Sequence, residues 1–63
     1  MKIIEVKYWK MKRIWTVSSA PLLGFETQRS AINFALNMRY DLLVIYNKSG
    51  KKYEMYTKDP SKF

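Results

Sequence analysis

Apolar and polar residues alternate in the first part of the chain, which is the pattern of β-strands with one buried face. The pattern predicts a first strand over residues 2–9, in which Ile4, Val6 and Tyr8 share one face and Ile3, Glu5, Lys7 and Trp9 the other. A second strand is predicted over residues 11–18, with Trp15 and Val17 on a common face. The polar break at 10–12 predicts a hairpin turn between them, although it holds no Gly or Asn.

The middle of the chain predicts a loop followed by one helix. Residues 18–24 read as a loop, because Pro21 and Gly24 both interrupt regular structure. The stretch 25–42 then shows helical periodicity, with Thr27 as the predicted N-cap. Its apolar arc consists of Ala31, Ile32, Phe34, Ala35, Leu36 and Met38. This arc needs a surface to pack on, and the flanking strands provide one.

Two further strands are predicted after the helix. The apolar run 42–46 reads as a central strand, and the Asn-Lys-Ser-Gly stretch 47–50 as a hairpin turn. The last strand, 51–57, alternates again, and Pro60 ends it. The predicted fold class is therefore α+β, with one helix on one face of a four-stranded sheet in the order strand, strand, helix, strand, strand. It forms a single domain over 1–60, followed by a C-terminal tail at 61–63.

The predicted sheet has one face against the helix and one open face. The inward set is expected to be Val6, Tyr8, Trp15, Val17, Leu42, Val44, Tyr53 and Met55. The open face would still carry Ile3, Ile14, Leu43, Ile45 and Tyr56, which is more apolar surface than a soluble monomer usually exposes. We therefore expect a homodimer through this face; the alternative is a different register that buries another set.

Composition narrows the chemistry. A chain of 63 residues forms a small core, and one without Cys or His lacks disulfides, thiolate zinc sites and the commonest general base, so self-association is the remaining means of stabilisation. The acids Glu5, Glu26, Asp41, Glu54 and Asp59 read as solvated partners of lysines, and no serine stands in a G-x-S-x-G motif. We expect a non-enzyme with no catalytic residues, no cofactor and no metal. No signal peptide or membrane span is apparent, so a cytoplasmic location is expected.

The formal net charge of +7 favours acidic partners. The two predicted hairpin turns carry basic clusters, made of Lys10, Lys12 and Arg13 in the first and Lys48, Lys51 and Lys52 in the second. Aromatic residues lie nearby in sequence, and lysines beside aromatics suit single-stranded nucleic acid. A geometric objection follows from the predicted fold. If the helix crossover makes the second and third strands parallel, the two turns lie at opposite ends of the sheet and one patch would need a dimer.

Several residues occur in an order that resembles a short family of uncharacterised bacterial and phage domains. They are Trp15 and Val17, then Phe25, Thr27, Gln28, Ala31 and Ile32, the run 43–45, Gly50, and Asp59 with Pro60. The resemblance covers 12–60 and departs from the family in the lysine-rich first turn, where Asp-Gly is more frequent, and in a longer loop before the helix. It implies a strand-strand-helix-strand-strand fold and no activity.

The function expected first is a small protein-interaction module, a homodimer that binds an acidic protein partner. Short, cofactor-free, basic proteins of this kind include phage-encoded inhibitors of host defence proteins, which act in the host cytoplasm. The expected interface comprises Ile3, Trp9, Ile14, Leu22, Leu23, Leu43, Ile45 and Tyr56. The alternative is a nucleic-acid-binding protein that uses Lys10, Lys12, Arg13, Lys48, Lys51 and Lys52.

Overall fold

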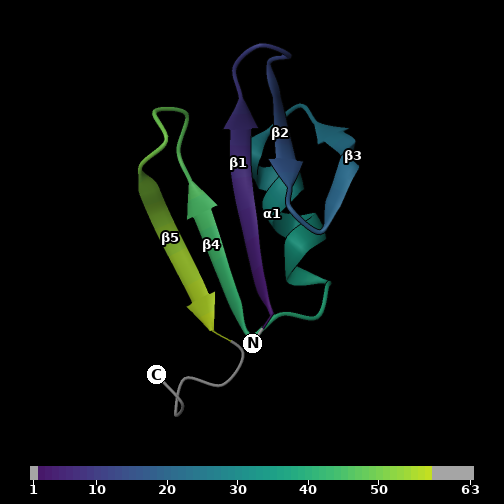
Figure 1. Ribbon diagram of the computed structural model, residues 1–63, viewed down its shortest axis with the longest axis vertical. Helices are drawn as coiled ribbons and strands as arrows, with labels where there is room; N and C mark the ends of the chain where they lie inside the picture. Colours follow the sequence, from purple (N-terminus) through teal and green to yellow (C-terminus); the bar gives the residue numbers. More distant parts are fainter. Residues whose placement is uncertain (1, 58–63) are drawn as a thin grey trace.

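A computed structural model describes residues 2–57 as a five-stranded mixed sheet with one helix on one face (Figure 1). The elements in chain order are β1 (Ile3–Trp9), β2 (Ile14–Val17), β3 (Ala20–Phe25), α1 (Gln28–Leu36), β4 (Leu42–Tyr46) and β5 (Lys52–Thr57). The predicted α+β class is confirmed, whereas the predicted number of four strands is wrong. Asp59, Pro60 and the predicted tail 61–63 lie outside the described residues.

The strand order across the sheet is β3-β2-β1-β4-β5. β1 pairs antiparallel with β2 and parallel with β4, while β4 pairs antiparallel with β5. The helix connects the edge strand β3 to β4, so this connection crosses β2 and β1 on one face of the sheet (Figure 1). The central pair β1 and β4 therefore points in one direction, which fixes where the two hairpin turns lie.

The segment predicted as a loop at 18–24 contains an additional strand. β3 pairs antiparallel with β2 through Trp15 with Phe25 and Val17 with Ala20, with a register irregularity between these pairs. Pro21 is tolerated because a proline, which has no N–H to donate, fits an edge strand. Gly24 allows a close approach, since a Cβ there would lie 2.8 Å from Cδ1 of Ile14. These features suppressed the strand signal in the sequence.

The helix is shorter than the predicted 25–42. The predicted N-cap is confirmed: Thr27 is extended, and its hydroxyl accepts a hydrogen bond from the Ser30 N–H at 3.2 Å. The helix ends at Leu36, with Asn37 as the C-cap. The stretch that follows leads back to the start of β1, where a carboxylate oxygen of Asp41 accepts from the Lys2 N–H at 2.6 Å. The N-cap thus located the start of the helix correctly, whereas helical periodicity overestimated its C-terminal end.

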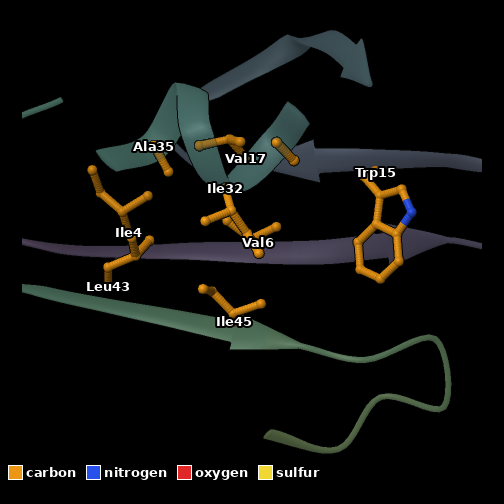
Figure 2. Close-up of a cluster of buried hydrophobic side chains, with 9 residues drawn as sticks. Ile4, Val6, Trp15, Val17, Ile32, Ala35, Leu43 and Ile45 are labelled. Carbon is orange, nitrogen blue, oxygen red and sulfur yellow. The ribbon is translucent and has the colours of Figure 1, made fainter. Parts of the chain in front are cut away.

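The core lies between α1 and the sheet (Figure 2). It comprises Ile4, Val6, Trp15, Val17, Ala31, Ile32, Ala35, Leu43 and Ile45. The predicted inward face of the first two strands is confirmed, because Val6, Trp15 and Val17 are buried and Tyr8 packs against them.

For the last two strands, the prediction of which side chains point toward the helix is wrong. Leu43 and Ile45, expected on the open face, are fully buried in the core, because the parallel register aligns them with Ile4 and Val6 of β1. Leu42 and Val44, expected to face inward, alternate with them and lie on the opposite face.

On β5, Tyr56 packs against the core rather than lying on the open face. Met55 and Tyr53, which were predicted to be buried, are 57% and 62% exposed.

The face away from the helix keeps a smaller apolar surface than predicted. Ile3 is 51% exposed, and Ile14 is half-buried against Gly24. Val44 is 5% exposed and lies between its cross-strand neighbours Glu5 on β1 and Met55 on β5. The single helix found in residues 2–57 is too short to cross a membrane.

Candidate nucleic-acid interface

Both lysine-rich hairpin turns lie at the same end of the sheet. β1 and β4 are parallel, and each is followed by a turn into its antiparallel neighbour, so the turns 10–13 and 47–51 leave the sheet together (Figure 1). The expectation that they point to opposite ends is wrong. Residues 7–13 and 47–52 contain seven of the twelve basic residues and none of the five acids. One monomer therefore concentrates positive charge at this end.

A hollow opens between the two turns because the central strands separate there. The β1–β4 register ends at Val6 and Ile45, whereas β1 continues to Trp9. The β4–β5 pairing has an irregularity between Ile45 and Tyr46, and such bulges bend and twist a strand. Figure 1 shows the β4–β5 hairpin diverging from β1. The resulting hairpin hollow, about 420 Å³, is lined by Lys7, Tyr8, Lys10, Tyr46, Asn47, Lys48, Ser49 and Gly50.

Lysines lie over aromatic rings around the hairpin hollow. The Lys48 Nζ is 5.1 Å from the ring centroid of Tyr8, and the Lys7 Nζ is 5.2 Å from that of Tyr46. At the first turn, the Lys12 Nζ is 4.7 Å from the ring of Trp9, which is 43% exposed. Exposed cation–π contacts of this kind contribute only about 0.5–1 kcal/mol, so a phosphate can recruit the ammonium at little energetic cost. The ring faces then become available for stacking.

The second turn is held rigid by Asn47. Its side-chain oxygen accepts hydrogen bonds from the Ser49 N–H at 3.0 Å, the Ser49 hydroxyl at 2.6 Å and the Lys51 N–H at 3.1 Å. Gly50 adopts a φ of 88°, which suits glycine, and its N–H donates to the Asn47 carbonyl at 3.0 Å. This organisation fixes the backbone from which Lys48 and Lys51 project.

A polar cluster on the outer face anchors the wall of the hollow. The Tyr46 hydroxyl donates to Oε2 of Glu5 at 2.9 Å, and the Lys7 Nζ lies 3.5 Å from Oε1 of the same carboxylate. The hydrogen bond to Glu5 raises the pKa of Tyr46 above its ordinary value, with smaller contributions from desolvation and from the charge of that carboxylate. On the other side, the Gln28 side chain donates to the Tyr46 carbonyl at 3.2 Å. Tyr46 is thus held from both the sheet and the helix.

The predicted basic residues do not all occupy the hollow. Lys10 and Lys48 line it, Lys12 covers Trp9, and Arg13 occupies the first turn with a φ of 55°. Lys51 belongs to the second turn, and Lys52 pairs with Tyr46 at the start of β5. Lys7 and Asn47 were not predicted as site residues. Lys7 was assigned only to the outer strand face, and the Asn-Lys-Ser-Gly turn signal was interpreted as purely structural.

The predicted protein interface is partly dispersed. Leu43, Ile45 and Tyr56 belong to or pack against the core, whereas Ile3, Trp9, Leu22 and Leu23 are exposed, Leu22 almost completely at 98%. Leu22 and Leu23 lie on the edge strand β3, and Ile3 lies on β1. Of the residues expected on the open face, Ile3 and Ile14 remain there, whereas Leu43, Ile45 and Tyr56 belong to the core side.

Within residues 2–57 no cluster of three or more acidic side chains is arranged to hold a metal ion. Comparisons with protein-family models, curated proteins and solved structures find no match to this chain. The resemblance to short bacterial and phage domains stays a prediction.

Proposed function

We propose that this protein binds single-stranded nucleic acid at the end of the sheet that carries both hairpin turns. The observation that carries the proposal is the parallel pairing of β1 and β4, which brings two basic turns together around one hollow. The field of seven basic residues attracts a polyanion, and a concave site with low-dielectric walls concentrates that field. A cytoplasmic location, where single-stranded RNA and DNA occur, fits this function.

The residues divide into two roles. Lys10 and Lys48 border the hollow and neutralise phosphates, a contribution that depends on salt but not on sequence. Tyr8 and Tyr46 offer ring faces on which bases stack, at about 1–3 kcal/mol per base. An unstacked base can reach these rings, whereas a base inside a duplex cannot. The preference is therefore for single strands.

The test is binding of a fluorescently labelled oligothymidylate, followed by anisotropy between about 50 and 200 mM salt. The wild-type affinity falls steeply with salt. The double variant Lys10→Gln/Lys48→Gln weakens binding and lowers the slope of log affinity against log salt by about 1.4, or about 0.7 per phosphate contact in a single strand. The matched control is Lys2→Gln/Arg39→Gln, which removes the same charge at the opposite end of the sheet, where β1 begins.

Two results would refute the proposal. The first is an affinity that does not change with salt. The second is a loss of slope that is equal in the hairpin variant and in the control variant, because net charge rather than the hollow would then govern binding.

A second candidate function is the protein-interaction module, for which the remaining exposed apolar residues argue. Ile3 and Met55 are each about half exposed on the face without a helix, with Val44 buried between neighbouring side chains. A homodimer through this face, or an acidic protein partner bound to it, would cover these residues. Light scattering separates the two functions. A stable dimer that ignores the oligonucleotide supports the interaction module, and a monomer that gains mass only with the oligonucleotide supports nucleic-acid binding.

A further inference from the structure

The hairpin hollow continues onto the helix side of the sheet. A second hollow of about 480 Å³ shares Asn47 and Lys48 with it and extends past Trp15 and the start of α1 to Tyr53. A third, of about 230 Å³, shares Gln28 and Tyr53 with the second. It is also lined by Arg29, Ile32, Glu54 and Tyr56. We call the second and third hollows together the helix-side groove.

The groove exists because one helix is too narrow for five strands. α1 packs on β1, β2, β3 and β4, and Figure 1 shows it behind β1 and β2 with β5 displaced to the side. The helix side of β5 is therefore left partly uncovered, and Tyr53 there is 62% exposed although it is a large aromatic residue. An exposed tyrosine that lines two hollows offers a ring face on which a base can stack.

We infer that a bound single strand runs from the hairpin hollow along the helix-side groove, with Tyr53 as a second stacking platform and Arg29 as a second phosphate contact. This inference rests on the proposed function and extends it to a path. Along that path, Lys48 lines both of the first two hollows, Tyr53 lines the second and third, and Arg29 lines the third. Cationic and aromatic groups therefore alternate along the route, as in single-strand binding grooves.

Two carboxylates constrain how the strand lies. Glu26 lines the second hollow and Glu54 the third, where Oε2 of Glu54 accepts a hydrogen bond from the Tyr56 hydroxyl at 2.8 Å. Phosphates avoid carboxylates, whereas the amino groups of bases can donate to them. The strand therefore turns its bases toward Glu26 and Glu54 and its phosphates toward Lys48 and Arg29.

The experiment compares a dinucleotide, chosen as a ligand too short to follow the whole path, with an oligonucleotide of about ten nucleotides that is long enough to reach the groove as well. The variants are Tyr53→Ala, Tyr53→Phe as the control that keeps the ring, and Arg29→Gln. Tyr53→Ala weakens binding of the long oligonucleotide about tenfold and leaves dinucleotide binding unchanged, whereas Tyr53→Phe binds both as the wild type does. Arg29→Gln lowers the salt slope for the long oligonucleotide only. Tyr53 and Arg29 are exposed, so the substitutions are expected to leave the fold intact. The urea unfolding midpoint of each variant checks this.

The outcomes separate the path from the proposed function. If Lys10→Gln/Lys48→Gln weakens both ligands while Tyr53→Ala and Arg29→Gln bind the long oligonucleotide as the wild type does, the path is refuted and the proposed function stands. If neither ligand binds the wild type, both are refuted. If Tyr53→Ala weakens the dinucleotide as strongly as the long oligonucleotide, Tyr53 acts on the hairpin hollow, and the separate path is refuted.

Discussion

Adjacent leucines at the start of β4 provide a direct test of how the sheet faces its helix. Leu43 is fully buried in the core, whereas Leu42 is only half-buried on the other face. The sequence pattern predicts the reverse assignment. Because the two residues are of the same type and are neighbours on one strand, the substitutions Leu42→Ala and Leu43→Ala differ mainly in the face that they affect.

The structure sets the expected magnitudes. Truncating a fully buried leucine to alanine costs about 2–5 kcal/mol, from lost transfer free energy and from the cavity that remains. A half-buried leucine loses less contact and leaves a space that water can fill, so Leu42→Ala costs about 1 kcal/mol or less. For 63 residues the whole free energy of unfolding is about 3–9 kcal/mol. Leu43→Ala therefore removes a large fraction of it.

Urea unfolding measures the difference, with the fluorescence of Trp15 as the probe, since this residue is 4% exposed. With a dependence of about 1 kcal/mol per molar urea, the midpoint of Leu43→Ala falls by about 2 M or more. If that variant does not fold, Leu43→Val provides a smaller step of about 1 kcal/mol. An unchanged midpoint for Leu43→Ala, with a large fall for Leu42→Ala, would show that the register of β4 is shifted by one residue.

Two further predictions concern the hairpin end. Arg13 has a φ of 55°, which is unfavourable for arginine and acceptable for asparagine, so Arg13→Asn keeps or raises the free energy of unfolding, by up to about 1 kcal/mol, while lowering the salt slope of nucleic-acid binding. A lower free energy of unfolding for Arg13→Asn than for the wild type would contradict the left-handed conformation of this turn residue. For Tyr46, the raised pKa means that the hydrogen bond to Glu5 stabilises the fold fully below the ordinary tyrosine pKa and is lost as pH rises through the raised value. Glu5→Gln therefore lowers the pKa of Tyr46 toward its ordinary value, as NMR titration of the ring resonances can measure; an unchanged pKa would exclude the bond.

The parts of the fold that could be predicted from the sequence are those with a periodic pattern or a cap. The alternation in β1 correctly separated Ile4 and Val6 from the outer face, and Thr27 was correctly identified as the helix N-cap. The uniformly apolar run 42–46 has no alternation, so its facing follows only from pairing with β1. Local pattern cannot contain that information.

The sequence identified the basic residues of the candidate site, but it did not show that they lie together on one surface. Turn chemistry located the basic clusters, and Lys10 and Lys48 do line one hollow. Their proximity depends on tertiary pairing, as does the role of Lys7, whose position over Tyr46 requires β1 and β4 to be neighbours. The helix-side groove depends on the width of the sheet relative to the helix, which the sequence pattern did not reveal.

One missed strand accounts for the largest error about the site. Without β3, the helix would follow β2, and a crossover to a parallel strand would make the next strand run with β2. The two hairpin turns would then lie at opposite ends of the sheet. β3 reverses the chain once more before α1, so β4 runs parallel to β1 instead. A six-residue edge strand containing Pro21 and Gly24 thus decides that both basic turns flank one hollow, and with it whether a monomer can present a contiguous surface to a nucleic acid.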